Sequence, residues 1–322
     1  MQKLQRGEKF ISVSLLDTTK MKNRFFVITF FLGLTAAQAQ QEPQFTQFMF
    51  FNQVYNPGYA GTSDSLLNTT AAYRNQWLGF PGNPITWFFC ADAPVKKLHG
   101  GLGLKFLDDQ LGNFHFDKLG LSYAWHKRIK ETGLLGIGME TELGRLAVKN
   151  NWLAPDGTNG ASDPAIPQVN ATGYSGNFSL GAYYRNYRWN VGFSVRQILP
   201  TVYHGSQLEY RAAPHFYLTA GYNFYFSSQG RIVASIFIKS DAAVTTFDLN
   251  TTVYWNRHIW TGISYRLQDA VAFMAGYAFN IRKRTAFKIG YAYDAGISDL
   301  RSYHSNTHEV FLNYSLKLKK KT

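Results

Sequence analysis

The stretch FKIGYAYD, residues 287–294, alternates two kinds of side chain along the chain. Its odd-numbered residues are Phe, Ile, Tyr and Tyr, and its even-numbered residues are Lys, Gly, Ala and Asp. A period of two places each set on its own face of a β-strand. The same alternation occurs in WNVGFSV, residues 189–195, and again over residues 309–318. The pattern therefore predicts a protein built from β-strands.

The second face of these runs indicates which kind of β-protein the chain forms. Soluble sandwiches also alternate, but here one face is apolar and aromatic in nearly every run, while the other carries Gly, Ser, Asn and charges. The charged members include Lys105, Glu140, Glu142, Arg196, Arg266 and Lys288. Lipid outside and a polar lumen inside explain this division, and Trp125, Trp189 and Trp255 near run ends fit aromatic girdles at the membrane interfaces.

We predict an all-β fold, a transmembrane antiparallel outer-membrane β-barrel of about 14 strands with an N-terminal plug-like segment. The predicted strands lie near residues 66–77, 84–94, 99–109, 113–128, 132–147, 174–187, 189–199, 214–227, 230–239, 243–256, 258–268, 270–281, 285–295 and 306–318. Every second connection is short, whereas those on the other side include 148–173, 200–213 and 296–305. Short periplasmic turns and longer outer loops are typical of barrels in the outer membrane of Gram-negative cells.

The N-terminal region predicts export. From Met21 the chain reads MKNR, then FFVITFFLGLTAA, and then Ala-Gln-Ala ending at Ala39. A basic start, a short apolar core and an A-x-A site describe a secretory signal peptide. We expect cleavage after Ala39, with 1–20 as an upstream extension, 21–39 as the signal, 40–65 as a plug or periplasmic segment and 66–322 as the barrel. Whether Met1 or Met21 is the true start stays open.

The segment QFTQFMFFNQVYNPGYAG, residues 44–61, has no ionisable side chain and is rich in aromatics and amides. It is unsuited to crossing lipid and too apolar to remain exposed. Burying its surface would contribute roughly 25 cal/mol per Å² of apolar area. We expect it to fold into the barrel mouth or against a partner, with a disordered tail before the first strand as the alternative.

The net charge of the chain is +13, and removal of residues 1–39, with six basic and two acidic residues, would leave +9. The basic residues gather at the short connections. They would anchor the turns at lipid headgroups or form a docking surface for an acidic periplasmic partner. The candidate partner-binding residues are Arg282, Lys283, Arg284, Lys96, Lys97, Phe48, Tyr55, Asn56, Pro57 and Tyr59. Nucleic-acid binding is not expected, because the aromatics face lipid and do not alternate with positive charge.

The residues that carry chemistry predict neither an enzyme nor a cofactor. Ser302, His304 and Ser305 lie in the last outer loop, where a solvated loop explains them better than catalysis, although a lipid-modifying enzyme would depend on them. The His residues lack metal-ligand spacing, and the pair Asp108-Asp109 would hold calcium only loosely. Cys90 is the only cysteine, so it cannot form an internal disulfide and is expected to pack as a small apolar residue.

Several blocks of the sequence resemble the PorP/SprF family of Bacteroidetes type IX secretion membrane proteins. They include QQEPQFTQFMFFNQVYNPGYAG, AAYRNQWLGFPGNPIT, GLGLKFLDDQLG, WTGISYRLQDAVAFMAGYAF, KIGYAYDAGISDL and THEVFLNYSL. The resemblance implies an outer-membrane barrel that works in protein export and gliding motility. It also implies periplasmic secretion proteins and the C-terminal domain of a secreted adhesin as partners. The chain departs from the family pattern at Gly58, where Ala is commoner, and in its LKLKKKT ending.

Two functions follow from these expectations. The first is a non-enzymatic outer-membrane component of the type IX secretion and gliding machinery that recruits or anchors a surface adhesin or periplasmic ring proteins. The alternative is a passive outer-membrane channel for small solutes. The contents of the lumen distinguish them, because charges such as Lys288, Arg266, Glu140 and Glu142 would fill the lumen if they pair.

Overall fold

A computed structural model describes residues 42–63, 66–150, 169–199, 201–205, 208–282, 284–298 and 306–318. All of them belong to the unit Ala39–Thr322. The predicted signal peptide, the cleavage site after Ala39, and Ser302, His304 and Ser305 lie outside the described residues.

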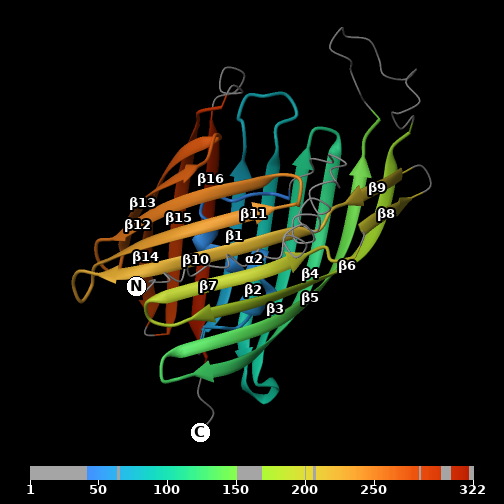
Figure 1. Cartoon of the computed structure of the whole chain (residues 1–322). Helices are drawn as coiled ribbons and strands as arrows, with labels where there is room; N and C mark the ends of the chain where they lie inside the picture. Colours follow the sequence, from blue (N-terminus) through green and yellow to red (C-terminus); the bar gives the residue numbers. More distant parts are fainter. Residues whose placement is uncertain are drawn as a thin grey trace, which may run out of the picture. The chain divides into compact units, whose positions relative to one another are not determined.

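The sheet closes on itself as a 14-stranded antiparallel barrel (Figure 1). Its strands are β1 (Leu66–Asn75), β2 (Ile85–Val95), β3 (Gly100–Leu111), β4 (Phe114–Ile129), β5 (Gly133–Val148), β6 (Ala171–Arg185), β7 (Trp189–Arg196), β10 (His215–Tyr225), β11 (Arg231–Ser240), β12 (Thr245–Tyr254), β13 (Ile259–Arg266), β14 (Ala270–Arg282), β15 (Thr285–Gly296) and β16 (Thr307–Lys317). Each pairs with its neighbour along the chain, β7 pairs with β10, and β1 pairs with β16. The predicted barrel and its strand number are confirmed.

A second, short hairpin departs from the sequence prediction. β8 (Thr201–Gly205) and β9 (Leu208–Ala212) pair with each other, and β8 joins the sheet edge through Tyr174 and His204 (Figure 1). The region 200–213 was expected to be an outer loop. Strands of five residues are too short to cross a bilayer, which takes about 9–11 residues, so the period that marks the barrel strands cannot reveal them.

The two faces of the wall have the predicted character. On β3, the outward side chains of Leu102, Leu104 and Phe106 are 38–45% exposed, whereas the inward Lys105 is 1% exposed. The predicted girdle residues Trp125, Trp189 and Trp255 are also exposed. Alternation along each strand therefore separates an apolar outer surface from a charged lumen. Among the described residues, no helix has the length and apolar character needed to cross a membrane.

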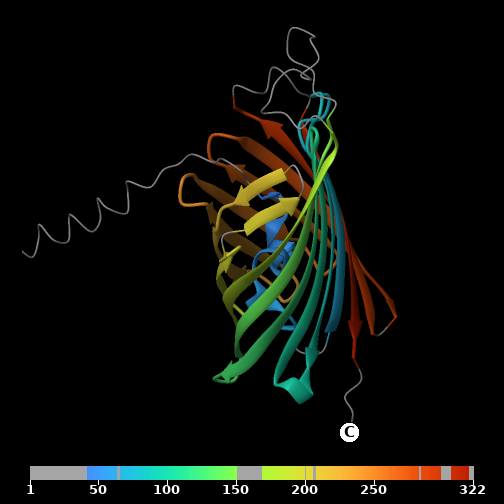
Figure 2. The same ribbon diagram turned by 90° about the vertical axis from the view of Figure 1, so that its right-hand side faces the viewer.

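The N-terminal residues 42–63, hereafter the plug segment, lie inside the barrel (Figures 1 and 2). They form three short turns of helix, η1 (Phe48–Phe50), α2 (Asn52–Tyr55) and η2 (Pro57–Tyr59). Their aromatic rings meet rings on well-separated strands of the wall. The ring centroids of Phe51 and Phe88 are 5.9 Å apart, those of Phe48 and Phe237 5.1 Å, and those of Phe50 and Phe311 4.8 Å. The segment thus spans the lumen and contacts β2, β11 and β16.

Close backbone contact seats the other end of the plug segment against β3. A Cβ atom added to the inward-facing Gly101 would lie 2.3 Å from the carbonyl oxygen of Ala60 and 2.5 Å from the Cα of Gly61. Gly61 itself has a φ of +65°, a conformation that L-residues with side chains rarely adopt. The wall and the plug segment can approach this closely only because neither carries a side chain here.

We expect the substitution Gly101→Ala to loosen the plug segment. The added methyl group must displace Ala60 or Gly61, at a cost of about 1–3 kcal/mol for an overpacked site. Limited proteolysis of the detergent-solubilised protein should then remove residues 42–63 faster than in the unmodified chain. Gly176→Ala is the matched control, since a Cβ there meets nothing within 4 Å. Equal cleavage rates for both variants would contradict this account of the contact.

Candidate functional site

Two clusters of buried charges fasten the plug segment to the wall. The first, hereafter the Arg74 cluster, is built from β1, β12, β13, β15 and β16 and comprises Arg74, Asp248, Arg266, Asp294 and Glu309. Arg74 places Nη2 2.9 Å from Asp294 Oδ2 and Nη1 2.9 Å from Glu309 Oε2. All five side chains are less than 9% exposed. The guanidinium of Arg74 therefore bridges two carboxylates that no water covers.

The carboxylates of the Arg74 cluster also bind the plug segment directly. Glu309 accepts hydrogen bonds from the backbone N–H groups of Thr46 and Gln47, at 2.8 and 2.9 Å. The Thr46 hydroxyl donates to Asp294 at 2.8 Å, and the Gln44 amide donates to Asp248 at 2.9 Å. Charge-assisted hydrogen bonds of this kind are about twice as strong as neutral ones. The start of the plug segment is consequently held by three wall strands.

The second cluster, hereafter the Glu42 cluster, surrounds the first described residue of the chain. Its members are Glu42, Lys105, Lys118, Glu140, Glu142 and Arg196. Glu42 Oε1 lies 2.7 Å from Lys118 Nζ, and Glu42 Oε2 accepts a hydrogen bond from Tyr217 at 2.9 Å. Burial raises the pKa of Glu42, but the positive charges of Arg196 and Lys118 outweigh burial and hold the pKa well below its ordinary value. Glu42 is therefore a carboxylate that ties the plug segment to β4 and β7.

The wall residues of the Glu42 cluster are paired among themselves as well. Lys105 Nζ lies 2.7 Å from Glu140 Oε1 and 3.0 Å from Glu142 Oε2, and Arg196 also pairs with Glu142. Three carboxylates thus meet three cations. Glu140, Glu142 and Arg266 pair inside the lumen as the sequence suggested, but the predicted pairing of Lys288 is wrong for the described residues, where Lys288 makes no ion pair. Lys288 shares one cavity with another cation, Arg231, and shares a neighbouring cavity with Asp92, with which it makes no ion pair.

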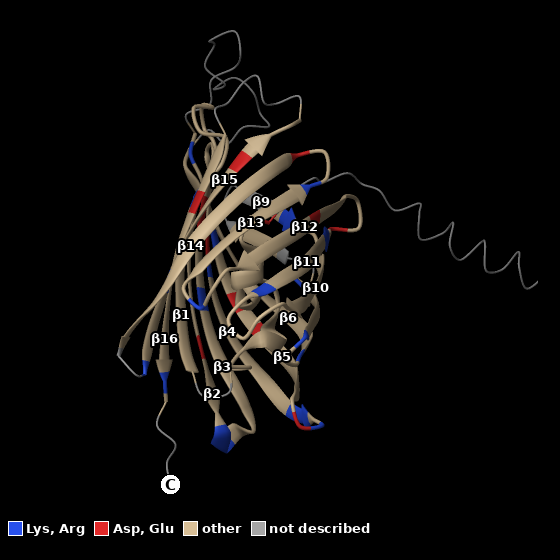
Figure 3. Cartoon of the chain, turned by 90° about the vertical axis from the view of Figure 1, so that its left-hand side faces the viewer, with Lys and Arg blue, Asp and Glu red and all other residues tan. Residues whose placement is uncertain are grey.

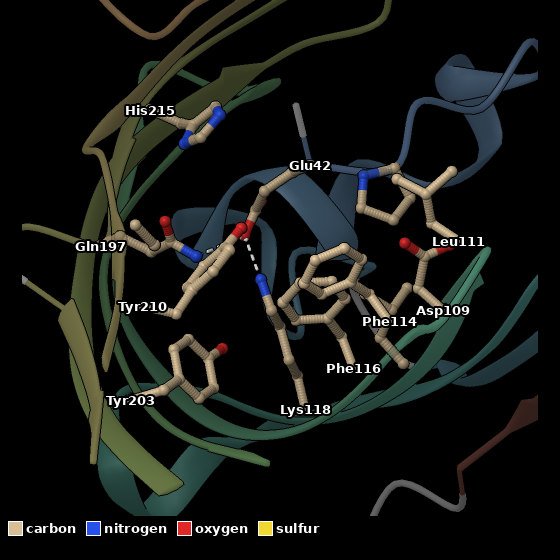
Figure 4. Close-up of a pocket in the computed structure, with 13 residues that line it drawn as sticks. Glu42, Asp109, Leu111, Phe114, Phe116, Lys118, Gln197, Tyr203, Tyr210 and His215 are labelled. Carbon is tan, nitrogen blue, oxygen red and sulfur yellow. Dashed lines mark hydrogen bonds and ion pairs between the residues drawn. The ribbon is translucent and has the colours of Figure 1, made fainter. Parts of the chain in front are cut away.

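A pocket of about 180 Å³ lies beside Glu42 and Lys118 of the Glu42 cluster (Figure 4), near the β3–β4 connection, whose flanking residues Leu111 and Phe114 line it. The paired side chains of Glu42 and Lys118 line it, with the aromatic rings of Phe114 and Phe116 beside them. Tyr203 and Tyr210, from the β8–β9 hairpin, complete its wall. A dry cavity of about 150 Å³ accommodates a benzene-sized group, so the pocket has room for one ring. The plug segment contributes Glu42 and Pro43 to its lining.

One set of side chains in the described part of the chain brings three possible metal ligands together. The ligand atoms of Asp108, His115 and Asp117 lie within 4.8 Å of one another. His115 Nε2 is 2.7 Å from Asp108 Oδ2, and Arg145 donates a hydrogen bond to Asp117 at 2.6 Å. All four side chains are partly exposed near the outer rim. Their mutual hydrogen bonds account for the arrangement without a metal.

The predicted partner-binding residues fall into two groups. Lys96 and Lys97 are exposed in η3 (Lys96–Leu98), and the exposed Arg284 donates a hydrogen bond to the carbonyl of Lys317 at 3.0 Å. Phe48, Tyr55, Asn56 and Pro57 are buried in the lumen, and Tyr59 is half-buried there. Arg282 ends β14, and Lys283 lies outside the described residues. A partner could touch the first four lumen residues only if the plug segment moved, and partner binding at all ten positions stays a prediction.

These features define a class of protein: an outer-membrane β-barrel whose lumen is occupied by its own N-terminal segment. The chain belongs to the PorP/SprF family of type IX secretion system membrane proteins, whose family model matches residues 37–314. The resemblance drawn from the sequence blocks is confirmed. No curated protein sequence matches the chain.

Solved structures similar to this chain include a channel and a transporter. The CymD monoaromatic hydrocarbon channel has a TM-score of 0.52 and 10% identity, with 84% of this chain and 93% of that chain covered. The Pseudomonas putida toluene transporter TodX has a TM-score of 0.49 and 9% identity, with 82% and 92% covered. At such identity the first likeness shows the fold alone. The family and these structures are described as secretion or transport proteins, not as enzymes.

Proposed function

We propose that this barrel is a non-enzymatic outer-membrane component of the type IX secretion and gliding machinery, and that it recruits or anchors a secreted surface adhesin or periplasmic ring proteins. The observation that carries the proposal is the occupied lumen. Phe45 and Phe51 are fully buried, and charged groups tie both Glu42 and Thr46 to the wall. A barrel filled in this way supports binding at its ends better than diffusion through its centre.

The end with the short turns is the favoured side for periplasmic partners. The turns after β2, β4, β6, β10, β12 and β14 lie at the end of the barrel where β16 finishes, and Figure 3 shows basic residues on several of them. Lys96 and Lys97, in the turn after β2, are exposed. A basic rim favours acidic protein surfaces and speeds their encounter. The C-terminal domain of an adhesin would meet the other end, where the longer connections lie.

Deletion of the gene tests the proposal. We expect a strain that lacks the protein to keep its outer membrane intact but to lose one surface adhesin, measured by labelling intact cells with an antibody to that adhesin. Complementation with the full chain should restore the label. A strain with unchanged surface proteins, unchanged gliding and a reduced uptake of small solutes would instead support the passive channel.

A further inference from the structure

A second cavity, of about 290 Å³, opens at the short-turn end of the lumen. Its lining contains positively charged side chains and no negatively charged ones. Its lining includes Arg231, Arg257 and Lys288 together with Trp260, and no Asp or Glu contributes to it. Arg231 and Lys288 lie on inward-facing positions of β11 and β15. The cavity is thus positively charged and faces the lumen, away from the lipid side of the wall.

Most other cations buried in the described part of the lumen lie against carboxylates. Lys239 instead donates a hydrogen bond to the backbone carbonyl of Glu42, at 2.7 Å. Arg74, Lys105, Lys118, Arg196 and Arg266 each lie within 4 Å of a carboxylate. Within the described ranges, neither Lys288 nor Arg257 makes an ion pair, and Arg231 lines the same cavity as both. Placing like charges together in a partly enclosed site lowers stability, and such sites are commonly functional.

Individual donor atoms in the cavity lack partners too. Among the described residues, the buried Nε of Arg231 and the buried Nε1 of Trp260 find no hydrogen-bond acceptor. The guanidinium of Arg231 is held in place because it stacks over the ring of Tyr254, 4.1 Å from the centroid. A buried donor left without an acceptor costs roughly 1–3 kcal/mol. A ligand that brings anionic oxygens would satisfy both donors and neutralise the cations.

We propose that this cavity binds a carboxylate of an acidic polypeptide segment that enters the barrel from the short-turn end. The inference rests on the proposed function, which puts periplasmic proteins at this end. It adds that such a partner carries an acidic segment. A carboxylate fits because Arg presents paired N–H donors and Lys adds a point charge. Lipid headgroups surround the outer face, whereas Lys288 and Arg231 point inward.

Binding of defined peptides to the purified full-length protein in detergent tests this proposal. We expect fluorescein-labelled hexaglutamate to bind more tightly than hexaglutamine, measured by fluorescence anisotropy. Lys288→Met should weaken binding of hexaglutamate roughly tenfold or more, because removing one partner of an enclosed charge pair is costly. Arg188→Gln is the control, since it removes the same charge from an exposed turn at the same end, outside the cavity.

The melting temperature separates a binding role of Lys288 from a structural one. Lys288→Met removes an unpaired cation, so we expect it to leave the melting temperature unchanged or raise it. Four results would overturn the proposal: equal binding of the two peptides, an equal loss with Arg188→Gln, tighter binding of inorganic phosphate than of hexaglutamate, or a lower melting temperature. None of these results would alter the adhesin labelling that tests the proposed function.

Carbodiimide coupling in intact outer membranes tests whether the carboxylate that contacts Lys288 belongs to this chain or to another protein. The reagent joins Lys288 to a carboxylate in contact with it, and mass spectrometry identifies the joined peptide. We expect a peptide of another protein. Coupling of Lys288 to a carboxylate of this chain, such as Asp92 in the neighbouring cavity or Asp64 outside the described residues, would show that the cavity is neutralised internally and would overturn the proposal.

Discussion

Arg74→Met should lower the stability of the folded barrel by roughly 3–5 kcal/mol, the usual cost of removing one partner from a buried ion pair. The substitution leaves Asp294 and Glu309 without the guanidinium that lies 2.9 Å from each. Arg266 is the nearest remaining cation, 3.8 Å from Asp294. Two neighbouring carboxylates would then repel each other in a buried site. The melting temperature in detergent, followed by loss of β-sheet ellipticity, measures the effect.

The outer surface provides a matched control for Arg74. Arg145 also pairs with an aspartate, Asp117, but its side chain is 46% exposed. Arg145→Met should cost only about 0–1 kcal/mol, because water screens and replaces an exposed pair. Comparable melting temperatures for the two variants would refute the claim that the Arg74 cluster holds the barrel and the plug segment together. Arg74→Lys should fall between them, since an ammonium cannot reproduce the planar two-armed contact.

Deletion of residues 42–63 should convert a closed barrel into a conducting one. The full-length protein in a planar lipid bilayer is expected to show no steady current steps, because the plug segment contacts β2, β11 and β16 across the lumen. Without it, the space occupied by four buried Phe and Tyr side chains becomes available to water and ions. Single-channel recording should then show stable open levels.

The full-length recording keeps this prediction testable if the deletion variant fails to fold. A steady, large conductance from the unmodified protein would by itself reject the closed lumen and support the passive channel. Gly101→Ala gives an intermediate variant, for which brief openings are expected because the plug segment is loosened without being removed. Gly176→Ala should stay as closed as the unmodified chain.

The strands could be predicted from the sequence because their signal is local. In FKIGYAYD the alternation alone assigns Ile289 and Tyr291 to the outer face and Lys288 to the lumen, and the structure agrees. The folding of the uncharged, aromatic plug segment into the barrel was likewise predicted from composition, since exposing those rings to water is costly. The β8–β9 hairpin was not predicted because its strands have only five residues each. Strands this short do not cross the bilayer, so they need not alternate between lipid-facing and lumen-facing residues.

The charge clusters could not be predicted, because their partners are distant in the sequence. Arg74 lies 220 residues from Asp294 and 235 from Glu309. From the sequence, each of the three is simply a charged residue on the inward face of its strand. Only the closure of the sheet brings Arg74 next to Asp294 and Glu309. The position of Glu42 was even harder to predict, since it precedes the first strand and belongs to no alternating pattern. Lys288 shows the converse: its inward position was predicted, but only the fold shows that it makes no ion pair among the described residues.

The location of the Arg74 cluster has a consequence for biogenesis. Arg74 belongs to the first strand of the barrel and Glu309 to the last, so the cluster sits on the seam where the two ends of the sheet join. Thr46 and Gln47 can find their acceptor only after the final strand has been inserted. The plug segment therefore acquires its complete set of anchors only when the last strand closes the cylinder, whereas its contacts with Lys118, Asp248 and Asp294 can form earlier.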